Sequence, residues 1–520
     1  MIRFRARGSV HSIAVGSELR RLAIRGAAAT ISASGMGLVV QLIGTVILAR
    51  LLTPADFGVV TMVTTFSLLL ASFGSNGFTE AVIQFEEMDH YTASNLFWLN
   101  TAGGLVLAIA FVPAGSALAR FYQNPLVANA AMGASLAIFI GAASVVHLAL
   151  LKRAMRFAAT STNDLVGRVV YTAVPILLAS RGWGYRALVA GIVGQQISVT
   201  IGAWWLHRWI PSLPRRTGKT AAAIRFAAKV YGQQSLRYSK GNIDNLLVGW
   251  RFNATALGFY KKAYDLFALS ASLLSASLDN VALAALSRVN QDPARFRRYL
   301  STSLGVIAFV GMAVGADLTL VGRDVVRLVL GPQWSESGRI FELFGPGIGV
   351  MLLGGTVGWI HLSIGNPGRW FRWTLVELAV TVFLFLVALP WGPKGIAAAW
   401  SVSYYILLIP AFWYAGRPIG LGVSFFVTAV WRYAAAALLA GFATAAIFRG
   451  TPFWASPVGR GPALEAAVII SSALVLLYLG AVLLLHWGFA PLRQLASILR
   501  ELAPRRTVTT PAAEPVGECK

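Results

Sequence analysis

The sequence has very little charge and a single cysteine. Only 12% of its 520 residues are charged and 57% are hydrophobic, whereas about a quarter of the residues in a soluble domain are charged. This composition excludes a large soluble domain, because there is too little charge to cover a surface that faces water. Cys519 has no second cysteine to pair with, which excludes an intrachain disulfide and a cysteine-based metal cluster.

Catalytic motifs are also missing from the sequence. It contains no GxxxxGK[ST] phosphate-binding loop and no HExxH metal site, and His147, His207 and His361 stand alone within apolar runs. No nucleophile is paired with a base, and no long extramembrane loop carries the paired carboxylates that sugar transfer needs. We therefore expect no enzyme activity, no ATP hydrolysis, no cofactor and no metal.

Apolar segments long enough to cross a bilayer fill most of the chain. About 20 residues of helix span the hydrocarbon core of a membrane, and such runs recur from Ala27 almost to the end of the sequence. The predicted spans are 27–50, 57–82, 93–119, 126–150, 161–180, 185–207, 226–250, 258–287, 300–331, 340–364, 370–390, 394–415, 424–448 and 464–488. The sequence thus predicts an all-α integral membrane protein with about fourteen transmembrane helices.

The formal net charge is +24, with 44 Lys and Arg against 20 Asp and Glu. In a soluble protein this excess would indicate a nucleic-acid partner, but in a membrane protein basic residues gather in cytoplasmic loops. The basic clusters fall at the N-terminus, in alternate loops and near the C-terminus. This pattern predicts a multi-pass membrane protein with both termini cytoplasmic and no nucleic-acid partner. The connection with Glu86, Glu87 and Asp89 is an acidic exception.

A short motif recurs six predicted spans apart. The first copy is LARLLTPADFG, from Leu48 to Gly58, and the second is VGWRFNATALG, from Val248 to Gly258. In both copies an Arg closes one helix and a Gly opens the next, as in transporters built from duplicated halves. We therefore expect two pseudo-symmetric lobes of six helices, followed by two additional helices.

The predicted organisation has six parts. They are a basic cytoplasmic N-terminal segment (1–26), an N-terminal transmembrane lobe (27–210), a basic cytoplasmic linker (211–225), a C-terminal transmembrane lobe (226–416), two additional transmembrane helices (417–492) and a disordered cytoplasmic tail (493–520).

The seventh predicted span is the most polar one. On a continuous helix, one face would carry a stripe made of Lys229, Gln233, Arg237, Lys240, Asp244 and Arg251. Ionised groups that face lipid cost several kcal/mol each at the bilayer centre. One Asp does not neutralise three cations, so the stripe indicates a water-filled cationic cavity that takes an anionic ligand. Two other interpretations stay open: an amphipathic helix at the membrane interface, or a structural pair between Arg237 and Asp244.

Further polar groups complete the candidate site. Asn245 follows Asp244, and Lys261 and Lys262 lie in the next span, where Lys261 is one turn from Asp265 and can pair with it. In the N-terminal half, Asn76, Asn100 and Arg168 lie within apolar runs. Intramembrane Asn often only joins helices through hydrogen bonds, but together these residues indicate a wet interior between two halves.

The same segments resemble a known family. Residues 48–58, the second span with Gly77 and its end at Val82-Ile83-Gln84, and the run from Asn242 to Tyr264 are similar to bacterial oligosaccharide flippases. These are the Wzx-like polysaccharide transporters of the multidrug/oligosaccharidyl-lipid/polysaccharide exporter superfamily. The resemblance covers nearly the whole chain, but it does not identify a substrate.

The resemblance implies a two-lobed bundle in the bacterial inner (plasma) membrane that opens alternately to the cytoplasm and the periplasm. The implied cargo is an oligosaccharide linked to undecaprenyl pyrophosphate, moved outward for O-antigen, capsule or exopolysaccharide assembly. The implied partners are this lipid-linked oligosaccharide, membrane lipids, a polysaccharide polymerase and a chain-length regulator. Alternatives are a lipid II flippase or drug/cation antiporter of the same superfamily and, from another class, a membrane-embedded polymerase or glycosyltransferase.

Overall fold

The computed structural model describes residues 12–85, 88–215, 218–289, 292–449 and 460–489, together with Pro491 and Arg493. The described residues are helical, with short connections and no strand among them. The chain is therefore an all-α protein, as the sequence predicts. The start of the predicted basic segment, Glu86 and Glu87 of the acidic connection, and the predicted tail after Arg493 lie outside the described residues.

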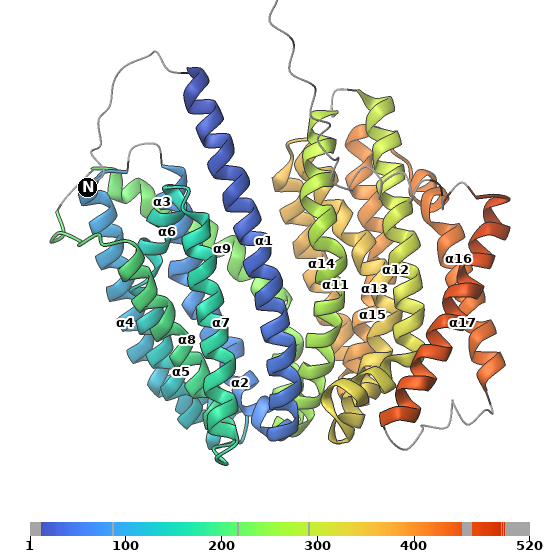
Figure 1. The fold of residues 1–520 in the computed structure, drawn as a ribbon, viewed down its shortest axis with the longest axis horizontal. Helices are drawn as coiled ribbons and strands as arrows, with labels where there is room; N and C mark the ends of the chain where they lie inside the picture. The colour runs from blue at the N-terminus through green and yellow to red at the C-terminus, as the bar shows by residue number, and fades with distance from the viewer. Residues whose placement is uncertain are drawn as a thin grey trace, which may run out of the picture.

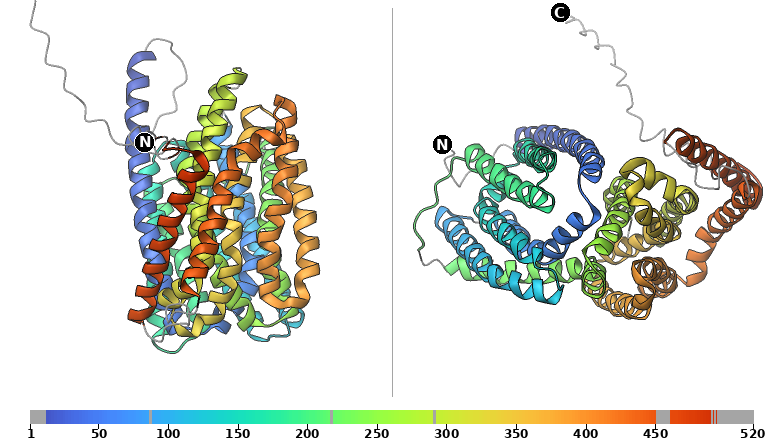
Figure 2. Two further views of the ribbon diagram at one scale, coloured as in Figure 1. Left: turned by 90° about the vertical axis from the view of Figure 1, so that its right-hand side faces the viewer. Right: turned by 90° about the horizontal axis from the view of Figure 1, so that it is seen from below.

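The first part of the chain forms one bundle (Figures 1 and 2). Its elements are α1 (Ser12–Leu51), α2 (Pro54–Ser72), the π-helical turn η1 (Phe73–Phe78), α3 (Thr79–Gln84), α4 (His90–Phe121), α5 (Leu126–Ala142), α6 (Val145–Arg153), α7 (Phe157–Ala179) and α8 (Tyr185–Leu206). α9 (Gly218–Lys240) then runs obliquely from this bundle toward the second one.

The second bundle lies beside the first (Figure 2). Its elements are α10 (Ile243–Arg251), α11 (Ala254–Arg288), α12 (Pro293–Leu330), η2 (Pro332–Trp334), α13 (Ser335–Ser363), α14 (Pro367–Ala388), η3 (Leu389–Trp391), α15 (Gly392–Gly416) and η4 (Arg417–Ile419). Two more helices, α16 (Val423–Phe448) and α17 (Arg460–His486), pack on its outer side against α12.

Capping residues explain where several helices begin. The Asp89 carboxylate accepts a hydrogen bond from the Thr92 amide at 2.9 Å and starts α4. Asn253 accepts one from the Ala256 amide at 2.8 Å and starts α11. Asp292 starts α12, with Pro293 as its first residue. These side chains satisfy amides that have no partner inside the helix.

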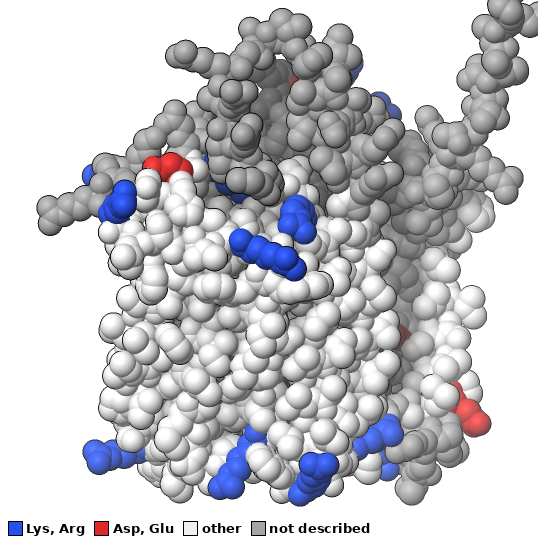
Figure 3. Space-filling view, turned by 60° about the vertical axis from the view of Figure 1, so that its left-hand side comes forward, with Lys and Arg blue, Asp and Glu red and all other residues white. Residues whose placement is uncertain are grey.

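The outer surface of the bundles is apolar. Ten helical segments in the described residues are long and apolar enough to cross a membrane, and one of them, Pro367–Ile419, holds both α14 and α15. Large side chains such as Ile201 and Phe442 are 65% and 74% exposed. Figure 3 shows a broad uncharged band between charged side chains near the two ends of the molecule. The chain is thus a multi-pass membrane protein, and the count of about fourteen spans stays a prediction.

The two copies of the repeated motif touch each other. A Cβ atom on Gly58 would overlap the carbonyl oxygen of Ala254, and a Cβ atom on Gly258 would overlap that of Pro54. The contact is reciprocal, so α2 and α11 cross at equivalent positions of the two copies. Only glycine permits backbones to approach this closely.

An apolar core surrounds this crossing. The ring of Phe57 lies 5.5 Å from that of Trp334, measured between centroids. The indole Nε1 of Trp334 donates a hydrogen bond to the Ala49 carbonyl at 2.8 Å. α1 and α2 are thereby joined to the start of α13, and the bundles are closed against each other at this end.

Candidate functional site

α9 has two faces that contact different parts of the molecule. Ala223 and Ala227 are buried in an apolar cluster with residues of η1, α3, α4 and α6. The hydroxyls of Tyr231 and Tyr238 donate hydrogen bonds to the α2 carbonyls of Leu69 and Thr64 at 3.2 and 3.1 Å. α9 therefore packs on the first bundle through one face, which leaves its polar face free to line a cavity.

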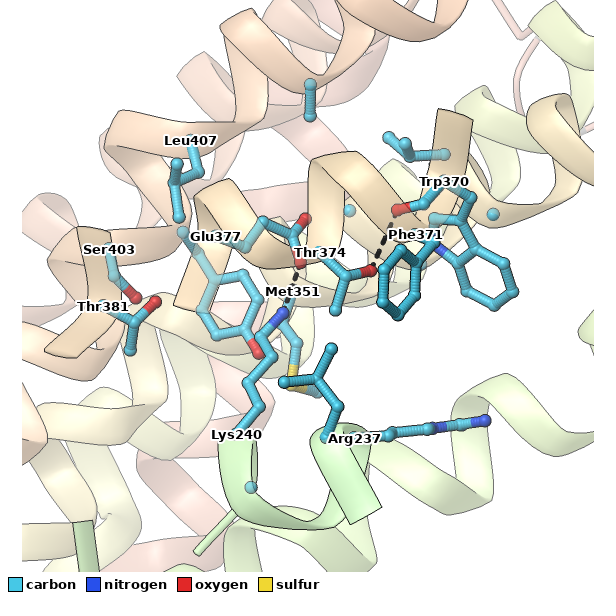
Figure 4. A pocket seen from close by; sticks show the side chains of 18 of the residues that line it. Arg237, Lys240, Met351, Trp370, Phe371, Thr374, Glu377, Thr381, Ser403 and Leu407 are labelled. Carbon is cyan, nitrogen blue, oxygen red and sulfur yellow. Dashed lines mark hydrogen bonds and ion pairs between the residues drawn. The ribbon is translucent and has the colours of Figure 1, made fainter. Parts of the chain in front are cut away.

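The polar face of α9 forms part of the wall of a cavity of about 610 Å³. The other walls come from α11, α13, α14 and α15 (Figure 4). Polar lining residues are Gln233, Gln234, Arg237, Lys240, Thr374, Glu377, Thr381 and Ser403. Aromatic lining residues are Tyr264, Trp370, Phe371, Trp400 and Tyr404. Such a cavity combines two cations, one carboxylate, amides, hydroxyls and aromatic rings, which suits a ligand with both anionic and sugar-like parts.

Lys240 and Glu377 form an ion pair across the cavity. Their side chains are 27% and 22% exposed, so water reaches both. The second carboxylate oxygen of Glu377 accepts a hydrogen bond from the indole of Trp373 at 2.6 Å. Arg237 lies one turn before Lys240, is exposed, and extends away from this pair in Figure 4.

The prediction of a single polar face from Lys229 to Arg251 is wrong for its last two members. α9 ends at Lys240, and α10 begins at Ile243 after a break at Gly241 and Asn242. The break rotates Asp244 away from the stripe and buries it, with 1% of its surface exposed. Its carboxylate accepts hydrogen bonds from the Tyr260 hydroxyl at 2.7 Å and the Asn245 amide at 2.8 Å.

Lys240 is consequently paired with a residue that the sequence interpretation did not consider. Glu377 interrupts the apolar run of α14, and an isolated acid within a predicted span is a sequence signal for a functional site. The aromatic lining residues carried no comparable signal, because aromatic residues are common in membrane helices.

The other predicted site residues lie outside this cavity lining. The Lys261 ammonium lies 2.7 Å from the Asp265 carboxylate, so the predicted pair is confirmed. The buried Lys262 ammonium lies 4.0 Å from the ring centroid of Phe57 in α2. Asn245 is buried beside Asp244. These residues lie in α10 and α11, next to the closed end of the bundles.

Three predicted residues belong to the first bundle. Asn100 is buried and donates a hydrogen bond to the Ala142 carbonyl at 2.7 Å, which joins α4 to the end of α5. Arg168 lies along α1, where a Cβ atom on Gly37 would come within 2.9 Å of its Cδ. Asn76 lies in the π-helical turn, and its side chain is outside the described residues.

Lys229 is exposed on α9, two turns before Arg237 and beyond the cavity lining.

Metal ligands do not gather in the described part of the chain, where no three His, Cys, Asp or Glu residues are placed to hold an ion.

Comparison with known proteins gives a consistent result. A family model described as "Polysaccharide biosynthesis protein" matches residues 47–339. The lipopolysaccharide biosynthesis protein WzxC of Escherichia coli strain K12 is 22% identical over 405 residues, which cover 75% of this chain and 79% of that protein. The succinoglycan biosynthesis transport protein ExoT of Rhizobium meliloti strain 1021 is 23% identical over 339 residues, covering 64% of this chain and 68% of that protein.

Solved structures share the fold. The lipid II flippase MurJ in an inward closed conformation superposes with a TM-score of 0.70 and 14% identity, covering 89% of this chain and 98% of that one. A multidrug resistance MATE family transporter of the MOP superfamily, in an inward-facing conformation, gives a TM-score of 0.60 and 13% identity, covering 76% of this chain and 98% of that one. These superpositions confirm the predicted all-α membrane fold.

Proposed function

Because the chain belongs to the family of polysaccharide biosynthesis proteins, we propose that it is a flippase for a lipid-linked oligosaccharide. The cargo is an oligosaccharide on undecaprenyl pyrophosphate, and it moves from the cytoplasmic to the periplasmic leaflet of the inner membrane by alternating access. The relatives named for lipopolysaccharide and succinoglycan biosynthesis support the general class of cargo. The closed crossing of α2 and α11 at one end supports a cycle in which the bundles separate there.

The cavity beside α9 is the observation that carries the proposal. Arg237 and Lys240 supply two cations for the pyrophosphate, and the guanidinium of Arg237 is suited to bidentate contacts with phosphate oxygens. Trp370 and Phe371 offer aromatic surface for sugar rings, and Gln233, Thr374 and Ser403 offer hydrogen bonds to sugar hydroxyls. Lys229 lies on the same face of α9 outside the cavity lining, where its positive charge adds to the attraction for the pyrophosphate.

Other cargoes fit the cavity less well. A drug/cation antiporter needs a net acidic site, whereas the charged residues of this lining are Arg237, Lys240 and Glu377, a net positive set. Lipid II also carries a pyrophosphate, so the test must use a defined surface polysaccharide. Restoration of peptidoglycan synthesis, in place of polysaccharide export, would favour that alternative.

The test is export of surface polysaccharide in a strain that lacks its own flippase. Charged hydrogen bonds contribute roughly 1.5–3 kcal/mol each, so Arg237→Ala combined with Lys240→Ala should lower export by about a hundredfold or more. Arg225→Ala is the matched control, because Arg225 is an exposed cation on the same helix outside the cavity lining. Membrane levels are checked by immunoblot. Parent-level export by the double variant would show that the stripe is structural.

A further inference from the structure

α9 is attached to the first bundle along its length. Before α9, the amide of Arg215 donates a hydrogen bond to the Asn95 side chain at 2.9 Å, and the Trp98 indole donates one to the Ser212 carbonyl at 2.9 Å. Within α9, Tyr231 and Tyr238 bond to α2. Any separation of the two bundles therefore carries α9 with the first one.

Glu377 belongs to the other side of the cavity. It lies on α14, which packs against α15 and α13 of the second bundle. The Trp373 indole, one turn earlier on the same helix, holds one oxygen of its carboxylate. The pair with Lys240 is thus a charged link between α9 and a helix of the second bundle (Figure 4).

We propose that this ion pair is exchanged when cargo binds. This inference rests on the function proposed above. The pyrophosphate of the cargo binds Lys240 in place of Glu377, and the link between α9 and α14 is broken at the same step. A partly exposed ion pair is screened by water and contributes little, so a ligand of higher charge can displace it. The pyrophosphate carries more negative charge than one carboxylate, and it gains Arg237 one turn away as a second cation.

The exchange makes the cavity selective for anionic lipids over neutral or cationic ones. A neutral lipid cannot compete with Glu377 for Lys240, and a cationic one is repelled by Arg237. The released Glu377 stays beside the bound pyrophosphate because Trp373 holds it, and its like charge weakens binding enough for release. Removing this charge should therefore strengthen binding and slow transport.

A zero-length carbodiimide cross-link tests the exchange in the unaltered protein. The reagent joins a carboxylate to an adjacent lysine, so Glu377 and Lys240 should form a cross-linked peptide detectable by mass spectrometry. Farnesyl pyrophosphate should suppress that peptide in nanodiscs, and the neutral alcohol farnesol should not. Glu336 and Lys394 form a pair at 2.6 Å outside this lining, and their cross-link should be unaffected by either probe.

Binding measurements on variants separate the two proposals. Glu377→Gln should bind farnesyl pyrophosphate about tenfold more tightly than the parent and export less polysaccharide, whereas the control Glu336→Gln should match the parent in both. A Glu377–Lys240 cross-link that persists with the probe bound, or a Glu377→Gln variant that binds no more tightly, overturns the exchange alone. Equal binding by the parent and the Arg237→Ala, Lys240→Ala variant overturns the proposed binding site itself.

Discussion

The proposed binding site depends on single charged residues within apolar helices. The sequence placed Gln233, Arg237 and Lys240 on one face, and the structure brings all three to the same cavity. The sequence did not reveal the partner of Lys240, because Glu377 lies 137 residues away. Pairing over such a distance depends on how the helices are arranged, which local spacing does not encode.

Asp244 shows the opposite case, in which a local signal was available. Gly241 and Asn242 are residue types that end helices, and α9 ends directly before them. Treating the span as one helix put Asp244 beside the cations, whereas it lies buried against Tyr260. Its carboxylate therefore stabilises the junction of α10 and α11, and it does not neutralise Arg237.

The geometry of the cation at position 237 should matter in addition to its charge. Arg237→Lys keeps the charge but replaces a planar group that makes two parallel hydrogen bonds with phosphate by a single ammonium. We expect export to fall about tenfold, consistent with the loss of one charged hydrogen bond of about 1.5 kcal/mol. The measurement is polysaccharide export at matched membrane levels. Arg225→Lys on the same helix should leave export unchanged, and parent-level export by Arg237→Lys would mean that charge alone is recognised.

At the scale of helices, the repeated motif was more informative than its short length indicated. The sequence showed two matching helix ends, at Arg50 and Arg251, each followed by a glycine in the next helix. The structure adds that these glycines contact each other's repeat. A sequence pattern can predict that two segments are equivalent, but their mutual contact depends on how the two bundles pack against each other.

The crossing of α2 and α11 should not tolerate a methyl group. Gly58→Ala or Gly258→Ala would force the helices apart at the closed end, and overpacking of this kind costs typically 1–3 kcal/mol. We expect a lower melting temperature of the purified protein and reduced export for both variants.

Two glycines elsewhere provide controls with the opposite expected sign. Gly441 in α16 and Gly480 in α17 have no atom within 4 Å of an added Cβ. Alanine at either position should raise stability by about 0.5–1 kcal/mol, because helical glycine is entropically unfavourable. If Gly58→Ala raises the melting temperature as Gly441→Ala does, the close approach of α2 and α11 is not maintained in the membrane.

At the scale of the whole molecule, the arrangement of helices shows which helix ends and connections lie at the same end. α1 begins and α17 ends at the upper end of the molecule in Figure 1, where α4 and α9 also begin. The α1–α2, α10–α11 and α12–α13 connections lie at the lower end, beside the closed crossing. α3 ends at the same upper end, where Arg153 donates hydrogen bonds to the Val82 and Phe85 carbonyls at 2.7 and 2.5 Å. A basic side chain therefore holds the end of α3.

We expect both termini to be cytoplasmic, because the basic residues at the end of α6 and the start of α12 lie at the upper end, where α1 begins and α17 ends, and basic loops stay on the cytoplasmic side. The test uses Cys519→Ser as background, with single cysteines at Ser9, Thr509, Asn124 or Gly182. A membrane-impermeant maleimide added to cells with a permeabilised outer membrane should label Asn124→Cys and Gly182→Cys, which lie in the α4–α5 and α7–α8 connections at the other end. Cysteines at Ser9 and Thr509 should react only after the inner membrane is opened. The reverse labelling pattern would mean that the molecule has the opposite orientation in the membrane. The closed crossing of α2 and α11 would then lie on the cytoplasmic side, and the proposed direction of transport would be untenable for this conformation.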